Sequence, residues 1–162
     1  MSEIHYANGG TDANEFVEVS GPAGLSLAGY TLVRYNGQNG RVYGDTVALN
    51  NSILDEGSGY GALAFNVSLF QNGPDGIALV SRVGDVVDFI SYESAAFPAT
   101  NGPARGRWST VMVNAGGLPV NEGSHTLPTE SLQLVGEASN PTWAGPLPAS
   151  AGRLNDGFNL RA

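Results

Sequence analysis

Apolar and polar residues alternate along much of this chain, most clearly between Leu69 and Glu93. Alternation with a period of two is typical of a β-strand with one buried face. The segment predicts two strands at residues 76–82 and 85–92, joined by a tight polar turn, and Val83 is expected to continue the apolar side of the first strand. The clearest pattern in the chain therefore indicates an all-β scaffold.

Other short alternating segments are separated by residues that favour turns. Asn-Gly pairs within residues 36–40 favour a hairpin turn, so residues 41–49 are expected to return antiparallel. In residues 15–19 the apolar and acidic positions do not segregate cleanly, which predicts an edge or partly exposed strand. The remaining expected strands are residues 2–6, 30–35, 57–65, 109–113 and 131–135.

The second half of the chain is poorer in pattern. Residues 95–108 are expected to form an ordered loop over one end of the fold, and the Gly-rich residues 114–127 to form a mobile loop. Trp143 is expected to plug the core or cover its end, and residues 146–162 to lie along the surface. Many short strands without a helical pattern predict an all-β sandwich with long C-terminal loops.

Composition agrees with this architecture. The chain has 162 residues, of which 41% are apolar, which is enough for one domain (1–162) with a real core. Its 23 glycines and 9 prolines suit a fold with many turns and suit a helical bundle poorly.

The charge limits the classes of partner. Fifteen acidic and seven basic residues give a net charge of −8, and all seven basic residues are arginines. Such a surface repels phosphate backbones, so direct nucleic-acid binding is disfavoured. Solubility is the simplest interpretation of the acidity, with a salty habitat or cation binding as alternatives.

The absence of certain residues and segments excludes some chemistries and limits where in the cell the protein is expected. Without cysteine there is no disulfide, thiolate zinc site or cysteine nucleophile. No run approaches the roughly 18 apolar residues of a membrane span. No signal peptide precedes the first strand, so we expect either a cytosolic protein or a mature chain whose signal has been removed.

Eight short blocks follow one another along nearly the whole chain. They are SEIHY (2–6), NEFVEV after a TDAN loop (14–19), LAGYTLVRYNG (27–37), LFQNGPDGIAL (69–79), GDVVDFISYE (84–93), TNGPARG (100–106), SLQLVG (131–136) and W…P…ASAGRLNDG (143–157). In order and spacing, these blocks resemble the bacterial lamin-tail domain. The closing block departs from the family's usual Thr-Pro-Gly-x-x-Asn and reads Ser-Ala-Gly-Arg-Leu-Asn at residues 150–155.

This resemblance implies an immunoglobulin-like β-sandwich in a secreted or cell-surface bacterial protein. Family members commonly stand beside catalytic domains, notably extracellular nucleases and phosphatases. The family has no shared catalytic residues, so the resemblance assigns none here.

Among the candidate acid–base groups, His5 alternates with its neighbours in a strand and is expected to be structural, while His125 lies in the loop expected to be mobile. No Gly-x-Ser-x-Gly motif accompanies them. The Gly-rich residues 57–61 imitate a phosphate loop but lack its lysine and its strand-to-helix context.

Oxygen-bearing side chains gather near the first loop. Asn8, Asp12 and Glu15 could supply the oxygen ligands that calcium prefers, although turn capping is the simpler role for such residues. Glu15 and Glu18 are expected on opposite faces of a strand, which argues against a glycosidase pair. Asp75 and Asp88 are expected in turn and packing roles.

The sequence therefore favours a non-catalytic accessory or interaction module, with an adjacent domain or a surface protein as partner and no cofactor. The alternative is a calcium- or glycan-binding module. A glycan platform would need exposed aromatic rings, for which the candidates are Tyr30, Tyr35, Tyr43 and Tyr60. Nothing positive supports an enzyme.

Overall fold

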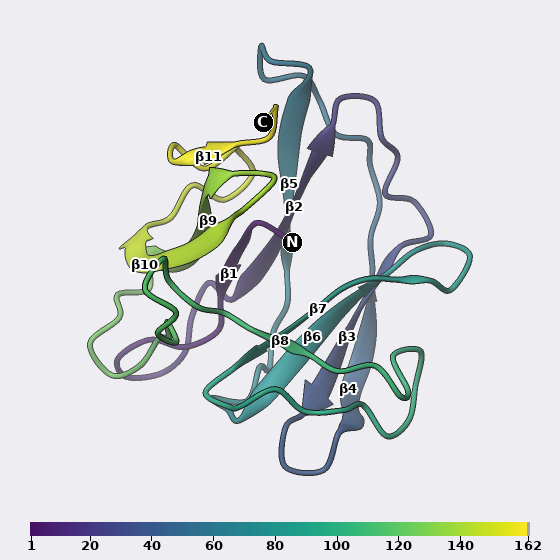
Figure 1. Cartoon of the computed structure of the whole chain (residues 1–162), viewed down its shortest axis with the longest axis vertical. Helices are drawn as coiled ribbons and strands as arrows, with labels where there is room; N and C mark the ends of the chain where they lie inside the picture. Colours follow the sequence, from purple (N-terminus) through teal and green to yellow (C-terminus); the bar gives the residue numbers. More distant parts are fainter. Residues whose placement is uncertain (162) are drawn as a thin grey trace. The chain divides into compact units, whose positions relative to one another are not determined.

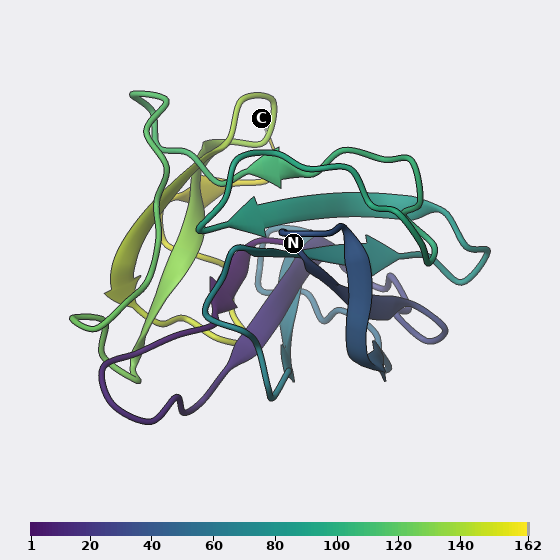
Figure 2. The same cartoon turned by 90° about the horizontal axis from the view of Figure 1, so that it is seen from below.

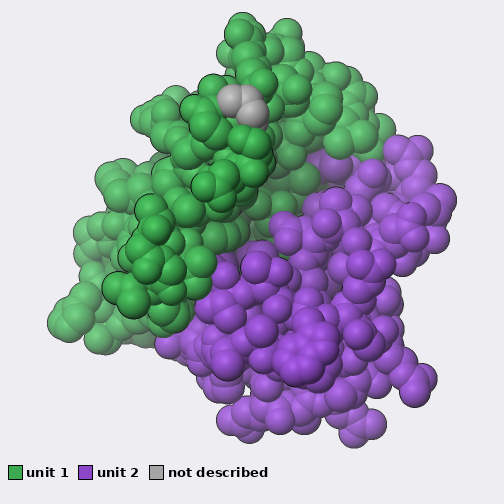
Figure 3. All heavy atoms as spheres, in the orientation of Figure 1, with its two compact units in different colours: residues 1–26, 52–70, 113–162 green, residues 27–51, 71–112 purple. Residues whose placement is uncertain are grey.

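The computed structural model describes residues 1–161, and within them the chain forms strands and loops without any helix. The chain divides into two compact units (Figure 3). Unit 1 contains residues 1–26, 52–70 and the described chain from 113 onwards, and unit 2 contains residues 27–51 and 71–112. Each unit holds one β-sheet.

The sheet of unit 1 has the strand order β10-β9-β1-β2-β5, with antiparallel neighbours (Figure 1). A further short strand, β11, pairs in parallel with β9. The strands are β1 (Glu3–His5), β2 (Phe16–Pro22), β5 (Tyr60–Asn66), β9 (Glu130–Glu137), β10 (Thr142–Pro148) and β11 (Phe158–Asn159).

The two faces of this sheet differ in chemistry. Ile4 of β1 lies opposite Val17 of β2 and Leu132 of β9, and all three are fully buried, so they form one apolar face. On the alternate positions, Glu3 lies opposite Glu18 and Gln133. These polar side chains are also buried. Both faces of the central strands are therefore withdrawn from water.

The placement of β2 corrects one expectation from the sequence. Strand β2 lies between β1 and β5 and is largely buried, so it is not an edge or a partly exposed strand. The mixed apolar and acidic pattern of residues 15–19 arises because the acidic face is covered by another part of the same chain.

The sheet of unit 2 has the order β4-β3-β6-β7-β8, and only the pairing of β7 with β8 is parallel. Figure 2 shows the same strands from a second direction, with the long loops that join them. The strands are β3 (Thr31–Asn36), β4 (Arg41–Ala48), β6 (Asp75–Val80), β7 (Val86–Tyr92) and β8 (Thr110–Val111).

The hairpin predicted from the alternating segment is present as β6 and β7, which pair antiparallel. The predicted return of residues 41–49 is also present, since β4 pairs antiparallel with β3. The expectation for Val83 is wrong, because this residue lies in the turn and is 77% exposed. All of β6 is buried on both faces.

The loop of residues 95–108 covers one side of the core of unit 2. Phe89 of β7 makes an edge-to-face contact with Phe97 of this loop at 5.6 Å between ring centroids, and lies 5.1 Å from the ring of Tyr35. The phenol oxygen of Tyr35 accepts a hydrogen bond from the backbone N–H of Ala104 at 2.9 Å. A Cβ atom on Gly76 would lie 2.9 Å from the Phe97 ring, so this close approach requires glycine. The buried cluster is Val33, Tyr35, Ala78, Val80, Phe89, Phe97, Ala99 and Ala104.

The C-terminal region differs most from expectation. Trp143 is buried within a strand, β10, that the sequence pattern did not predict. Residues 146–148 complete β10, and β11 adds a second unpredicted strand. In both views the yellow C-terminal segment runs beside green β9 (Figures 1 and 2). Parts of this tail thus extend the sheet, and most of its described residues are exposed or half-buried, as expected for a segment at the surface.

The all-β class predicted from the sequence is confirmed, and the two sheets are consistent with an immunoglobulin-like β-sandwich. Within residues 1–161 no helix is long and apolar enough to cross a membrane. The assignment of residues 1–162 to a single domain stays a prediction.

Replacement of Phe89 by alanine is expected to lower the free energy of unfolding by about 3–5 kcal/mol, because it leaves a cavity between two aromatic rings. The matched control is Val87→Ala on the same strand, where the side chain is 58% exposed and the expected change is within about 0.5 kcal/mol. Urea denaturation measures both variants. Equal losses in the two would contradict this account of the core.

Candidate functional site

The polar face of the unit 1 sheet holds two buried carboxylates side by side. Glu3 of β1 lies directly opposite Glu18 of β2, and neither side chain is exposed to solvent. Buried charges need partners, because transfer from water to the interior disfavours the charged form. The surroundings of this pair therefore decide what it can do.

Glu3 accepts several hydrogen bonds. Its Oε1 receives the hydroxyl of Ser131 at 2.5 Å and the backbone N–H of Ser150 at 2.8 Å, and its Oε2 receives the hydroxyl of Ser150 at 2.9 Å. The side-chain amide of Gln133 donates a longer bond of 3.3 Å to Oε1. Glu3 is thus surrounded by donors from strand β9 and from the segment that follows β10.

Glu18 has fewer donors. The hydroxyl of Ser2 donates to its Oε1 at 2.8 Å, and the backbone N–H of Gly152 donates to its Oε2 at 3.0 Å. Burial raises the pKa of Glu18 to about 8, with further contributions from the charge of Glu3 and the hydrogen bond to it, while the bonds from Ser2 and Gly152 act against this rise. At neutral pH, Glu18 therefore keeps its proton.

A segment that we call the C-terminal strap, residues 149–155, covers these carboxylates. Alternate backbone N–H groups of the strap each donate to a glutamate. Those of Ser150 and Gly152 donate to the buried pair, as described above, and that of Leu154 donates to Oε2 of Glu56 at 2.9 Å. The buried side chain of Asn155 completes the strap by donating to the backbone oxygens of Ser2 and Leu134. The paired carboxylates hold the strap and are closed to a substrate.

A second buried polar pair lies at the other end of β1. His5 Nδ1 lies 2.7 Å from Oε1 of Glu122, and both side chains are fully buried. Oε2 of Glu122 accepts the backbone N–H groups of Tyr6 at 2.6 Å and Ala7 at 2.9 Å. The loop that the sequence suggested to be mobile, residues 114–127, is thus anchored to the first strand.

The geometry makes His5 a double donor. Its Nε2 lies 3.0 Å from the backbone oxygen of Ala13, an acceptor only, while Nδ1 faces the carboxylate of Glu122. Burial by itself lowers the pKa of His5, but the hydrogen bond to Glu122 and the charge of that group outweigh burial, and the pKa is raised. The expected structural role of His5 agrees with this buried ion pair.

The structure brings together two of the three residues proposed for calcium. The backbone N–H of Asn8 donates to Oδ1 of Asp12 at 3.0 Å, and Oδ1 of Asn8 accepts the N–H of Ala13 at 2.9 Å. The carboxylate of Glu15 instead accepts the N–H groups of Leu69 and Phe70 at 3.0 and 3.1 Å. No group of three or more acidic or histidine side chains within residues 1–161 is placed to hold a metal. Calcium binding by Asn8, Asp12 and Glu15 stays a prediction.

The Gly-rich loop at residues 57–61 does bind an anion, but this anion is a carboxylate of the same chain. Oδ1 of Asp55 accepts the backbone N–H groups of Gly57, Ser58 and Gly59 at 2.8–3.0 Å. These bonds, led by that from Gly59, lower the pKa of Asp55. The carboxylate thus occupies the position that a phosphate would take in such a nest of N–H groups.

Asp75 begins strand β6 and is buried, which raises its pKa to about 6. Its Oδ1 accepts the N–H of Gly37 at 3.3 Å, so it joins β6 to the turn between β3 and β4. Asp88 lies within β7 and is half-buried. The packing roles expected for both residues agree with these positions.

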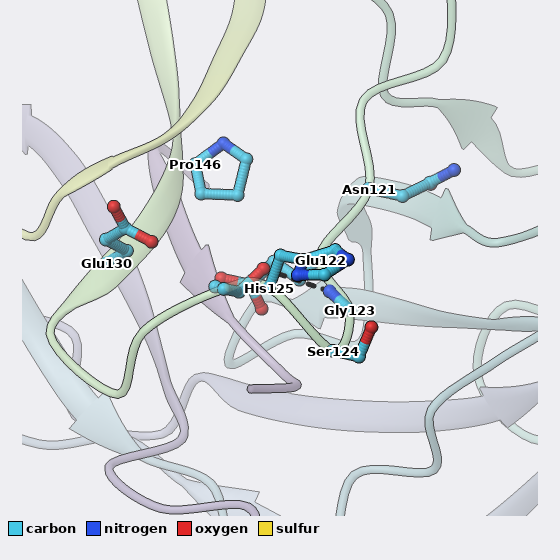
Figure 4. Close-up of a pocket in the computed structure, with 8 residues that line it drawn as sticks. Asn121, Glu122, Gly123, Ser124, His125, Glu130 and Pro146 are labelled. Carbon is cyan, nitrogen blue, oxygen red and sulfur yellow. Dashed lines mark hydrogen bonds between the residues drawn. The ribbon is translucent and has the colours of Figure 1, made fainter. Parts of the chain in front are cut away.

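His125 lies beside an open pocket of about 470 Å³ formed by residues 121–126, Glu130 and Pro146 (Figure 4). In this view Glu130 and Asn121 lie on opposite sides of His125. Glu122 also lines the pocket, but both of its carboxylate oxygens bind β1 and the residues that follow it. Glu130 accepts the N–H of Leu127 at 2.9 Å. The pocket offers polar groups without a nucleophile and base joined by a hydrogen bond.

Three residues of this site were not found from the sequence, namely Glu3, Glu122 and Asn155. The sequence does place Glu3 and Glu18 within two predicted strands. It does not give the register of those strands, which brings the two residues opposite each other. The hydrogen-bond partners of the Glu122 carboxylate lie 115 or more residues away, and Asn155 itself lies in a tail for which no element was predicted.

Comparisons with family models, with curated proteins and with solved structures gave no match for this chain. The resemblance to the lamin-tail domain therefore rests on the sequence blocks alone.

Replacement of Glu18 by glutamine is expected to stabilise the protein by about 1–3 kcal/mol at pH 7 and to leave it nearly unchanged at pH 4. The unfolded chain releases the Glu18 proton near pH 4.5, whereas the folded chain keeps it up to about pH 8. Folded stability therefore falls as the pH rises between these values. Glutamine is a neutral isostere that avoids this loss.

Urea denaturation from pH 4 to pH 9 measures the effect of Glu18→Gln. The exposed Glu137 on β9 supplies the control variant Glu137→Gln, for which we expect no such pH dependence. A Glu18→Gln protein that is less stable than the parent at pH 7 would contradict a shared proton.

Replacement of Glu122 by glutamine is expected to lower the pKa of His5, because it removes the charge that opposes burial. The stability that the raised pKa of His5 contributes is present below pH 6.5 and is lost as the pH rises through the folded pKa. Breaking this buried pair is expected to cost about 3 kcal/mol at pH 6. NMR titration of the two imidazole rings measures the change, with exposed His125 as the internal control. An unchanged His5 titration would sink the assignment of an imidazolium.

Proposed function

We propose that this chain is a non-catalytic accessory or interaction module of the lamin-tail type, part of a secreted or cell-surface bacterial protein. The observation that carries the proposal is the use of its acid–base groups. Glu3, Glu18, Glu122 and His5 are all buried and bound to the chain's own loops and strands. These groups bind parts of the chain to one another, and a substrate has no access to them.

The distances along the sequence support a scaffold role. Glu3 binds Ser150, and His5 binds Glu122, so one three-residue strand binds two loops that each lie more than 100 residues from it in the sequence. Such internal ties hold a fold rigid and leave its outer loops to contact a partner. The partner is an adjacent domain or another surface protein.

The sequence blocks supply the context of the proposal. They resemble modules found beside extracellular nuclease and phosphatase domains, and we propose such a neighbour in the full-length protein. The alternative is a calcium- or glycan-binding module. Of the four tyrosines considered for a sugar platform, Tyr35 is fully buried and the others are only partly exposed, which weighs against a platform of tyrosines.

Assays of the purified chain with a DNA phosphodiester and an aryl phosphate substrate test whether the module is catalytic. We expect no turnover above the buffer rate. His125→Ala is the informative variant, since His125 lines the open pocket. Turnover by the parent chain that disappears in His125→Ala would overturn the proposed function.

Thermal unfolding with and without millimolar calcium tests the alternative. We expect the melting temperature to stay constant, because the oxygens of Asn8, Asp12 and Glu15 already accept hydrogen bonds within the chain. A rise that saturates with calcium and is absent in Asp12→Asn would favour the cation-binding module, since a ligand of the folded state raises its stability.

A further inference from the structure

An exposed tryptophan and three arginines mark one part of unit 2. Trp108 is 66% exposed, and Arg105 and Arg107 are exposed on the same loop. Arg41, also exposed, begins strand β4 next to this loop. We call Arg41, Arg105, Arg107 and Trp108 the arginine–tryptophan surface.

Backbone hydrogen bonds hold this surface in place. Within the loop, Ala99 donates to the backbone oxygen of Arg107 at 2.9 Å and accepts the N–H of Gly106 at 2.8 Å. The loop is joined to the β3–β4 hairpin by the N–H of Thr100, which donates to the oxygen of Gly40 at 2.7 Å. The buried side chains under the loop fix it further. A surface that is already ordered loses little entropy when it binds a ligand.

The arginines of this surface have no acidic neighbours along the chain. Residues 94–121 contain no aspartate or glutamate, and neither do residues 27–44, which form the hairpin up to β4. Within residues 1–161 none of these three guanidinium groups forms an ion pair or a side-chain hydrogen bond. Their charges are therefore available to an external anion.

The net charge of the chain hides this feature. Unit 1 carries ten carboxylates and two arginines, whereas unit 2 carries five carboxylates and five arginines. The whole excess of negative charge thus belongs to unit 1. The argument from composition against anionic partners applies to the chain as a whole and does not describe the arginine–tryptophan surface.

The residues around Trp108 narrow the class of ligand. The loop beside it exposes small or polar positions such as Gly102, Pro103 and Gly106, and no second large apolar side chain. A protein interface normally has an apolar centre larger than one ring. A nucleic acid binds through many closely spaced phosphates and gains affinity with each one that a lysine or arginine neutralises, whereas this surface offers three arginines.

An acidic polysaccharide meets these conditions better. The apolar face of a pyranose ring can cover one indole ring, and a guanidinium group binds a carboxylate or sulfate through two parallel hydrogen bonds. Such a polymer carries about one charge for every sugar or two, so three arginines can pair with the charges of a short stretch of it. Arginine also stays charged at physiological pH, because its pKa lies far above that range.

We propose that the arginine–tryptophan surface binds an acidic polysaccharide, with a sugar ring on Trp108 and its carboxylate or sulfate groups on Arg105, Arg107 and Arg41. This inference goes beyond the proposed module, whose partner is a domain or a surface protein, and adds an acidic polysaccharide as a further ligand.

Titrations with polygalacturonate, alginate, hyaluronate and heparin test the proposal, with fully methyl-esterified pectin as the uncharged match of polygalacturonate. The chain has two tryptophans, and Trp143 is buried, so a change in fluorescence on binding reports Trp108. Calorimetry gives the affinity. We expect at least one acidic polymer to bind, the esterified pectin to bind at least tenfold more weakly, and 0.5 M salt to weaken the binding.

Variants connect the binding to the surface. Trp108→Ala and the double variant Arg105→Gln/Arg107→Gln are each expected to weaken binding at least tenfold. Arg153→Gln, an exposed arginine of unit 1, is the matched control and is expected to bind as the parent does. Because all of these side chains are exposed, the melting temperatures should agree within a few degrees, which separates lost binding from lost folding.

Several results would overturn the inference. These are no binding to any of the four acidic polymers, binding that Trp108→Ala and the double arginine variant leave unchanged, or tight binding of oligo-dT in place of the polysaccharides. Such results leave the interaction module itself standing. Catalytic turnover, or a melting temperature that rises with calcium, counts against the module instead, so the two failures are distinguishable.

Discussion

Two glutamates buried at one point of a sheet set the main constraint on this structure. Glu3 and Glu18 face each other across β1 and β2, where water cannot screen them. Two adjacent carboxylates cannot both be charged in such a place, so one keeps its proton and both require donors. The C-terminal strap supplies those donors with its own backbone. The path of the last part of the chain thus follows from two residues near its beginning.

The same logic extends along the first strand. One end of β1 binds the strap through Glu3, and the other binds the loop before β9 through His5 and its partner Glu122. In many proteins such buried, proton-sharing groups belong to active sites. Here each of these groups forms hydrogen bonds that hold a loop against the sheet. A binding site is therefore expected on an exposed surface and not among these groups.

The second unit is built on a different principle. Its core is aromatic and aliphatic, with Phe89 between Tyr35 and Phe97, and its covering loop contributes both buried and exposed residues. The inner side of that loop packs on the sheet, and the outer side carries Trp108. A loop fixed from below in this way can present a rigid binding surface without any cavity, which is a common arrangement for recognition on β scaffolds.

The sequence by itself determined the local elements. Alternation predicted the β6–β7 hairpin, and turn residues predicted the return of β4, because both depend on neighbours along the chain. It did not reveal β10, whose pairing with β9 shifts register between Ala144 and Leu147, or β11, which has two residues, because neither shows a clear alternation. The role of Glu3 was also missed, since it depends on hydrogen bonds to residues more than 100 positions away. An acidic residue within a strand pattern is normally interpreted as exposed, because the sequence does not show which segment covers it. Only the tertiary structure, which brings the strap onto that face, decided that Glu18 is buried and shares a proton.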